Sequence, residues 1–382
     1  MKSTGKKLAS LLALVLVFVM TFAPVCAYAD SAYTEIFGTT TTFNKYLVVS
    51  SDANIPAAEF SFSVSAPTSK IDGDATHLPV LPGPTPTSVV VGTAGKVSFA
   101  AGAGTTAGTA TDGIANDTAK KYAIAEVTVD LTAVKFQEPG VYRYIITEAA
   151  SSAPFTNDAT TTRTLDVYVI DTDGVLSVQN YVMYSGTKED APLAAGGEVT
   201  GKSNQFVNSF ATNNLTLKKT VSGNQGSKDK YFKFTLTIEN AGKGTIVNIS
   251  ADSTYVKEPP KTEYTAYTAA DMKTANDVTT LTANDSGVIT HDFYLSHNDT
   301  VIITGIPTTA TYTIAEEAEE YTSTVTGSLT GNFSSAVSVT VNNERTGTVP
   351  TGVMLTVIPG AVIVLVAIVG LVLISRKKKD EE

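Results

Sequence analysis

Apolar and polar residues alternate along most of this chain. The pattern is clearest at 60–64, 142–146, 165–169 and 234–238. Side chains alternate between the two faces of a β-strand, so this period predicts strands with one apolar face. Turn-forming pairs such as Pro139-Gly140 and Asp173-Gly174 separate the segments. Short alternating strands divided by turns predict an all-β fold built from antiparallel, Ig-like sandwiches.

The predicted strands divide into two tandem domains, which we place at 30–211 and 212–346. Each domain opens with an alternating strand that carries a lysine, at 43–49 and at 215–221. In each, a Phe-rich strand follows, a later strand leads to a glutamate, and the closing strand ends in asparagine. This common order indicates a diverged internal repeat.

One long segment of the first domain departs from the pattern. Residues 82–117 are rich in Gly, Ala, Thr and Pro. Such composition is typical of turns and of segments with little to bury. We therefore expect 82–117 to be a surface insertion, partly ordered at best.

The same three polar residue types fall on apolar strand faces in both domains. Lys45, for example, lies two residues from both Phe43 and Leu47, and side chains two apart share a face. The complete set is Lys45, Glu148 and Asn208 in the first domain and Lys219, Glu316 and Asn343 in the second. We expect all six side chains to point into a core.

Two interpretations account for these buried polar residues. A buried charge costs several kcal/mol unless it is paired or neutralised. One interpretation is therefore a buried Lys–Glu ion pair with a hydrogen-bonding Asn in each domain. The other is an intramolecular Lys–Asn isopeptide bond with Glu as the catalyst. Burial lowers a lysine pKa and raises a glutamate pKa, which favours a neutral, nucleophilic amine beside a carboxylic acid.

The first 29 residues have the organisation of a cleaved signal peptide. Three lysines precede an apolar run at 8–22, and the small-x-small site Ala27-Tyr28-Ala29 follows. The only cysteine, Cys26, lies inside this segment. The mature chain is thus expected to be secreted and to contain no disulfide.

The C-terminal segment, 347–382, resembles a sortase sorting signal. An apolar stretch at 354–374 is long enough for a transmembrane helix, and the basic tail at 376–382 would stay in the cytoplasm. Directly before it stands a short motif: Val349, Pro350, Thr351 and Gly352. In such a signal the sortase attacks the Thr351 carbonyl, and Gly352 leaves with the anchor. The alternative is a plain single-pass anchor with a chance tetrapeptide.

Charge and composition narrow the function classes. The net charge is −10, which argues against nucleic acid and anionic membranes as partners. The three histidines, His77, His291 and His297, have neither a nucleophile nor metal-ligand spacing around them, so we expect surface residues, no metal and no cofactor.

Several segments together resemble a known family. They are Phe206-Val207-Asn208-Ser209-Phe210, Leu215-Thr216-Leu217-Lys218-Lys219-Thr220-Val221-Ser222-Gly223, Tyr312-Thr313-Ile314-Ala315-Glu316 and Val349-Pro350-Thr351-Gly352-Val353. The chain is similar to the two-domain major (backbone) pilins of Gram-positive bacteria, of the streptococcal type. The resemblance implies tandem B-type collagen-adhesin sandwiches, one bond from Lys45 to Asn208 with Glu148, and one from Lys219 to Asn343 with Glu316.

The resemblance also implies partners and a location. A pilus sortase would join Thr351 of one copy to a lysine of the next, with minor pilins and cell-wall peptidoglycan as further partners. The protein would belong to the cell wall or a surface pilus, anchored in the membrane only before sorting. Related pilins place the acceptor lysine shortly before the bonding Asn, which leaves Lys202 and Lys188. Both are expected to be exposed, and Lys202, which has no acidic neighbour beside it, is favoured.

Two other functions stay open at this point. A wall-anchored adhesin or minor pilin would carry the same sorting signal but would be attached only once. A secreted hydrolase is the remote alternative, since no nucleophile elbow, P-loop or zinc motif stands in the chain. An enzyme with turnover is not expected.

Overall fold

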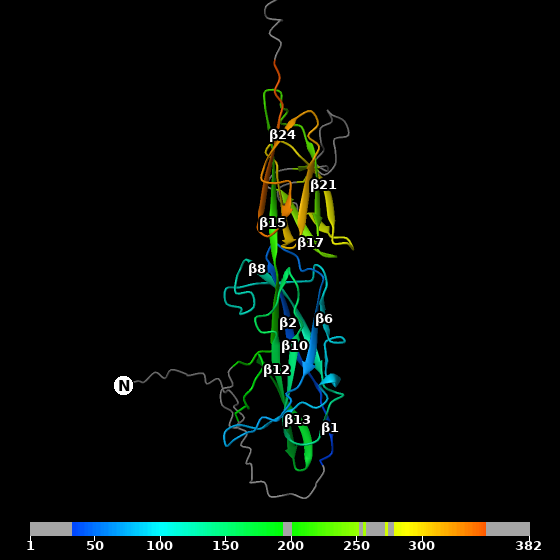
Figure 1. Cartoon of the computed structure of the whole chain (residues 1–382), viewed down its shortest axis with the longest axis vertical. Coiled ribbons are helices and arrows are strands. Elements are labelled where there is room, and N and C mark those ends of the chain that lie inside the picture. The colour runs from blue at the N-terminus through cyan, green and yellow to red at the C-terminus, as the bar shows by residue number, and fades with distance from the viewer. Residues whose placement is uncertain (1–32, 194–200, 252–254, 257–271, 274–278, 349–382) are drawn as a thin grey trace, which may run out of the picture.

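The computed structural model describes residues 33–193, 201–251, 255–256, 272–273 and 279–348. Within these ranges the regular structure is β-strand, apart from one 3₁₀ turn, η1 (Pro86–Ser88). The strands form two sandwiches that follow one another along the long axis of the molecule (Figure 1). The predicted all-β, Ig-like fold class is confirmed.

The N-terminal sandwich consists of two main sheets and one small pair. The first sheet has the order β13 (Val175–Ser185), β12 (Thr162–Thr172), β10 (Gly140–Glu148), β3 (Ala58–Ser65), β6 (Lys96–Phe99), with β4 (Val80–Pro82) beside β10. The second has the order β11 (Phe155–Thr156), β14 (Gln205–Phe210), β2 (Thr40–Ser50), β8 (Lys120–Asp130), β5 (Val90–Val91), with β7 (Thr106–Ala107) beside β8. The small pair is β1 (Ile36–Phe37) with β9 (Lys135–Phe136).

The C-terminal sandwich consists of two sheets. One has the order β20 (Thr279–Thr282), β17 (Ile246–Ala251), β22 (Thr300–Pro307), β15 (Thr212–Ser222), β26 (Val337–Glu344), β24 (Thr322–Thr326). The other has the order β19 (Met272–Lys273), β18 (Tyr255–Val256), β21 (Ile289–Leu295), β16 (Phe232–Glu239), β23 (Thr311–Glu316), β25 (Thr330–Asn332).

Each sandwich has its own apolar core between its sheets. In the N-terminal core, Phe43 of β2 packs against Phe62 of β3 and Phe206 of β14, with ring centroids 5.4 and 5.1 Å apart. The contact with Phe62 joins the two sheets, whereas the contact with Phe206 joins neighbouring strands of one sheet. Aromatic pairs stabilise a core beyond the area they bury. The alternating sequence pattern thus identified the inward faces.

In each sandwich, the first long strand and the last strand are parallel neighbours. β2 pairs with β14, and β15 pairs with β26. Only Ala211 separates β14 from β15, so the last strand of one sandwich leads directly into the first strand of the next (Figure 1). The two strand pairs therefore follow each other through the length of the molecule.

The expectation for residues 82–117 was wrong. β5 pairs with β8 and β6 pairs with β3, so this segment completes both sheets of the N-terminal sandwich. It also supplies four side chains of the main core cluster: Val89, Val91, Val97 and Phe99. The Gly, Pro and Thr residues serve turns between very short strands, and strands this short give too little alternation for the composition to reveal.

Polar contacts hold the two sandwiches together at their junction. The Asp52 carbonyl accepts hydrogen bonds from Asn248 Nδ2 at 2.9 Å and Thr304 Oγ1 at 3.1 Å. Asn54 Nδ2 donates to Asn248 Oδ1 at 2.9 Å. Ala53, between these contacts, is fully buried. This turn after β2 therefore seats the N-terminal sandwich on strands of the C-terminal one.

Both ends of the chain lie outside the described residues. This applies to the predicted signal peptide at 1–29, the sorting motif at 349–352, the predicted transmembrane helix at 354–374 and the tail at 376–382. Among the residues that the structure describes, no helix has the length and apolar character needed to span a bilayer.

We predict that Val91→Ala lowers the free energy of unfolding of the N-terminal sandwich by about 2 kcal/mol, because it removes two buried methyl groups. The adjacent Val90 is 42% exposed, whereas Val91 is 2% exposed. Val90→Ala, the matched control, should change the free energy by less than about 0.5 kcal/mol. Denaturant unfolding measures both, and equal effects would mean that 82–117 adds nothing to the core.

Candidate functional site

In the N-terminal sandwich, strand register brings two of the predicted side chains onto one inward face. Lys45 on β2 lies opposite Phe206 of β14, and Asn208 lies opposite Leu47. Lys45 and Asn208 are thus offset by two residues on parallel neighbours, which gives them the same face. Glu148 ends β10 in the opposite sheet. The carboxylate therefore reaches the pair from across the core.

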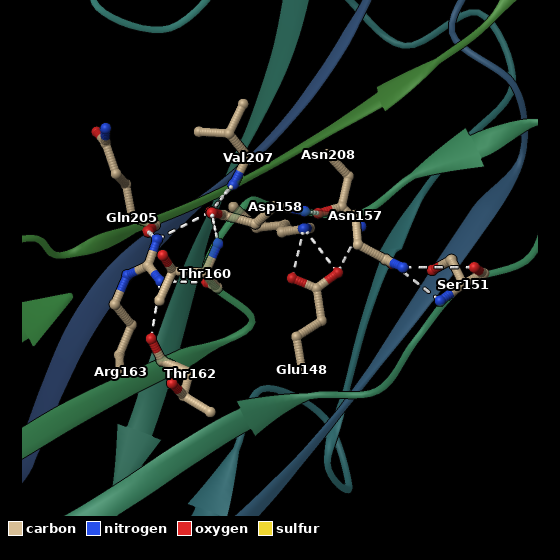
Figure 2. A network of polar contacts seen from close by, with 11 residues as sticks. Glu148, Ser151, Asn157, Asp158, Thr160, Thr162, Arg163, Gln205, Val207 and Asn208 are labelled. Carbon is tan, nitrogen blue, oxygen red and sulfur yellow. Dashed lines mark hydrogen bonds and ion pairs between the residues drawn. The ribbon is translucent and has the colours of Figure 1, made fainter. Parts of the chain in front are cut away.

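The three side chains form a closed polar cluster. Lys45 Nζ lies 2.8 and 2.9 Å from the two oxygens of Glu148. Asn208 Nδ2 donates to Glu148 Oε1 at 2.5 Å (Figure 2). Lys45 and Asn208 are fully buried, and Glu148 is 2% exposed. The glutamate thus contacts both the amine and the amide nitrogen in a site without solvent access.

The surroundings of Lys45 disfavour its charge. Its Nζ lies 4.4 Å from the centroid of the Phe60 ring. Burial lowers the pKa of Lys45 to about 8, although the ion pair with Glu148 acts in the opposite direction. A neutral, nucleophilic amine is therefore far more accessible at this position than at a surface lysine.

The C-terminal sandwich repeats the arrangement. Lys219 on β15 lies opposite Val341 of β26, and Asn343 lies opposite Val221, the same offset of two residues. Lys219 Nζ lies 2.7 Å from Glu316 Oε1, to which Asn343 Nδ2 donates at 2.9 Å. Burial again lowers the pKa of Lys219. The two halves of the repeat thus share the cluster as well as the strand order.

One functional neighbourhood escaped the sequence analysis. In the N-terminal sandwich, the main-chain N–H of Asp158 donates to Asn208 Oδ1 at 3.1 Å. Asp158 Oδ2 in turn accepts from Arg163 Nη2 at 2.8 Å (Figure 2). Asp158 lies in a loop, where no periodicity signals its role. Arg163 could have been found, because it shares the apolar face of β12 with Leu165 and Val167.

The two candidate acceptor lysines differ in their surroundings. Lys202 is exposed, as expected. Lys188 is only partly exposed, contrary to expectation, and its Nζ lies 5.7 Å from the centroid of the Tyr184 ring. Its main chain is also held, because Arg143 Nη1 donates to the Lys188 carbonyl and Lys188 N–H donates to Thr164 Oγ1. No pattern in the sequence indicates that a buried arginine anchors this turn.

The remaining site expectations concern the histidines, metals and the sorting motif. All three histidines are partly buried rather than fully on the surface, and His297 Nδ1 accepts a hydrogen bond from the Val221 N–H. No group of His, Cys, Asp and Glu suited to a metal occurs among the described residues. Val349, Pro350, Thr351 and Gly352 lie outside these residues.

Comparison with known proteins gives matches across both sandwiches. A family described as the Spy0128-like isopeptide containing domain (FctA) matches residues 42–211. A second family, a domain of unknown function (DUF7601), matches residues 213–345. Among curated proteins, the chain is similar to a protein named "Pilin" from Streptococcus pyogenes serotype M1. The two are 26% identical over 269 residues, which are 65% of this chain and 71% of that protein.

Solved structures with a similar fold include major pilins of Streptococcus pyogenes. The major pilin protein T3.2 from serotype GAS13637 aligns with a TM-score of 0.50 at 21% identity, over 81% of this chain and 99% of that one. The major pilin from Streptococcus pyogenes aligns with a TM-score of 0.47 at 20% identity, over 82% of this chain and 100% of that one. The first of these likenesses shows a shared fold.

The lowered pKa of Lys45 predicts how the stability of an unreacted domain depends on pH. Asn208→Ala leaves Lys45 and Glu148 in place but without an amide to react. Between about pH 8 and the ordinary lysine pKa of 10.5, the unfolded chain binds a proton that the folded chain has lost. The free energy of unfolding should therefore rise with pH in that window and show no such rise below it.

Lys45→Met is the matched control, since it too lacks an amine–amide pair but has no lysine to titrate there. Denaturant unfolding of both variants at about pH 7 and about pH 9.5 measures the difference. Asn208→Ala should gain stability relative to Lys45→Met at the higher pH. A constant difference would mean that burial does not depress the pKa of Lys45.

Proposed function

Because the chain belongs to the major pilins of Gram-positive bacteria and is a structural subunit of a pilus shaft on the cell surface, we propose that two internal Lys–Asn isopeptide bonds stabilise it and that a sortase polymerises it. The bonds are those from Lys45 to Asn208 and from Lys219 to Asn343. The observation that carries this proposal is the repeated cluster in which one buried glutamate contacts both the lysine amine and the asparagine amide.

The geometry supports a defined sequence of proton and bond changes. Glu148 accepts a proton from Lys45, and the neutral Nζ attacks Cγ of Asn208. The carboxylic acid then returns the proton to the leaving Nδ2, and the carboxylate takes up the second proton of Nζ. The products are one amide bond, one ammonia molecule and a protonated Glu148. Most of the acceleration comes from proximity, because the fold holds the reacting groups together. Glu316 takes the same role toward Lys219 and Asn343.

The bonds would link strands whose separation is needed for unfolding. Each joins the first and the last strand of a sandwich, β2 to β14 and β15 to β26. A cross-link between residues far apart in sequence restricts the unfolded chain, as a disulfide does. The chain has a single cysteine, Cys26, and so cannot form an internal disulfide. Isopeptide bonds would thus give an extracellular shaft protein a cross-link that is independent of redox conditions.

The link between subunits is the second part of the proposal. The sorting motif supplies the donor: the sortase thiolate takes the Thr351 carbonyl, and Gly352 leaves with the membrane anchor. The acceptor is a lysine amine of the next copy. Exposure of Lys202 and the partial burial of Lys188 support Lys202 as the acceptor. Attachment of minor pilins and of the finished shaft to peptidoglycan would use the same chemistry.

The internal bonds predict a definite mass. The purified two-sandwich protein should be lighter than its sequence mass by two ammonia molecules. Glu148→Gln should regain one of them, because the variant lacks the acid and base that serve the N-terminal bond, and it should be digested faster by protease. Intact-mass spectrometry of the denatured protein measures both states.

Glu59→Gln is the control for this experiment, since Glu59 is an exposed carboxylate paired with Lys96 at 2.7 Å. It should retain both bonds. A wild-type protein at its full sequence mass would reject internal bonds in both sandwiches.

Polymerisation predicts a ladder of multimers on a denaturing gel of cell-wall extracts. Lys202→Arg should abolish the ladder, because arginine keeps the charge but is no nucleophile. Lys188→Arg should leave it intact, and so should Lys218→Arg, a control at an exposed lysine on β15. Loss of the ladder with Lys188→Arg alone would move the acceptor to Lys188. A single discrete band from the wild type would indicate attachment only once, as in an adhesin or minor pilin.

A further inference from the structure

The N-terminal cluster contains a hydrogen-bond donor that the proposed Lys–Glu–Asn chemistry does not use. It is the main-chain N–H of Asp158, which lies 3.1 Å from Asn208 Oδ1. We propose that this N–H stabilises the oxyanion that forms during synthesis of the bond from Lys45 to Asn208, and that the Asp158 carboxylate and Arg163 position it. The inference rests on the proposed function, because it concerns the rate of the same reaction.

The two hydrogen bonds of the Asn208 side chain fix the orientation of its amide. Nδ2 donates to Glu148 Oε1, and Oδ1 accepts from the Asp158 N–H (Figure 2). The nitrogen that must leave thus contacts the acid that protonates it. The oxygen contacts a donor on its other side. A flipped amide would lose both interactions.

The proposed donor contacts the atom at which negative charge develops. When the Lys45 amine attacks Cγ of Asn208, a new C–N bond forms and the C–O π electrons move onto Oδ1. When the intermediate collapses, these electrons restore the C=O bond, and Nδ2 leaves as ammonia with the proton from Glu148. The Glu148 carboxylate takes up the second proton of Nζ, which leaves a neutral amide. A main-chain N–H held against the buried Asn208 side chain stabilises the intermediate without having to reorganise.

The side chain of Asp158 holds the loop against the strand that carries Asn208. Asp158 Oδ2 accepts from the N–H of Val207, the residue before Asn208, at 2.8 Å. Oδ1 accepts from the Thr160 N–H at 2.9 Å, which closes the loop on itself. The Asp158 N–H and its acceptor, Asn208 Oδ1, are thereby tied to the same point of β14 and should move together.

Arg163 fixes this loop from the side of β12. Its Nη2 donates to Asp158 Oδ2 at 2.8 Å, and its Nη1 donates to the carbonyls of Thr160 and Thr162. The guanidinium lies 4.4 Å from the centroid of the Phe206 ring. A charged pair buried this deeply leaves few alternative positions for the loop. Arg163 and the Asp158 carboxylate are therefore positioning groups, since neither contacts the reacting amide.

The C-terminal cluster differs at this point. Asn343 Oδ1 is buried and has no hydrogen-bond partner among the described residues. Its glutamate instead accepts a hydrogen bond from Ser323 Oγ at 3.1 Å. Both clusters thus contain a lysine, a glutamate and an asparagine. In the N-terminal cluster the asparagine carbonyl oxygen accepts a hydrogen bond, whereas in the C-terminal cluster it accepts none from the described residues. We expect the N-terminal bond to form faster.

The test is a time course of bond formation. The full chain is recovered unfolded in denaturant, where its full sequence mass verifies that it is unbonded, and is then diluted into buffer. Samples are quenched and digested, and the loss of ammonia is assigned to each sandwich by peptide mass. The time course is repeated between about pH 6 and pH 9, and folding is followed separately by circular dichroism.

Asp158→Ala keeps the main-chain N–H but loses the carboxylate that holds it in place. It should therefore lower the rate of the N-terminal bond by about 10-fold, less than the loss of about 100-fold or more that follows complete removal of an oxyanion donor. The pH at which the rate is half-maximal should not rise, because the Asp158 carboxylate is one of the charges that raise the pKa of Lys45 and its loss lowers that pKa. The C-terminal bond in the same molecules should form at its wild-type rate.

Asp112→Ala is the matched control, because the Asp112 carboxylate also accepts main-chain N–H groups in a loop of the N-terminal sandwich but does not contact Asn208. It should leave the rate unchanged. If Asp158→Ala does not fold, Asp158→Asn serves in its place, since it retains the shape and an acceptor for the Thr160 N–H. It loses the acceptor for Val207 and should slow the reaction in the same direction.

Three results would overturn the inference: a folded Asp158 variant that reacts at the wild-type rate, a loss of rate equal to that in Asp112→Ala, or a slower rate accompanied by a pH profile shifted to higher pH. The last would mean that the substitution acts through the Lys45–Glu148 pair. A wild-type chain whose N-terminal sandwich never loses ammonia would instead reject the proposed function itself.

Discussion

The whole arrangement depends on the burial of one lysine amine in each sandwich. Lys45 and Lys219 lie at positions where an alternating strand would otherwise place an aliphatic residue, and each is fully buried. A charge there costs several kcal/mol unless a partner compensates it. The partner is a glutamate from the opposite sheet. Each carboxylate reaches across the core from the last residue of its strand: Glu148 ends β10, and Glu316 ends β23.

The parallel pairing of first and last strands turns this local constraint into an architecture. A parallel pair needs the whole intervening chain to return to its starting side, so each lysine meets its asparagine only when the sandwich is complete. β14 then runs into β15 with one residue between them. The two clusters therefore lie along one continuous line of strands, and the junction contacts at Asp52 and Asn54 keep the sandwiches in line with it.

The sequence contained enough to locate both Lys–Glu–Asn clusters, because a polar residue that keeps the period of an apolar strand face must point inward. The same reasoning applied to Arg163 would have revealed part of the network around Asn208. Asp158 could not be found this way, since loops have no period and its key group belongs to the main chain. The core strands within 82–117 were missed for a related reason: strands of two to four residues are too short to display alternation against a Gly- and Thr-rich background.

The burial that makes the unreacted clusters costly also favours the proposed product. Before reaction each core holds an ammonium and a carboxylate whose attraction must offset the loss of their hydration. After reaction it holds a neutral secondary amide and a carboxyl group that can remain hydrogen-bonded to it, and ammonia has left the site. Replacing buried ions by neutral groups of similar shape is often stabilising. Desolvation would therefore promote the proposed reaction twice, because it depresses the pKa of the amine and favours an uncharged product.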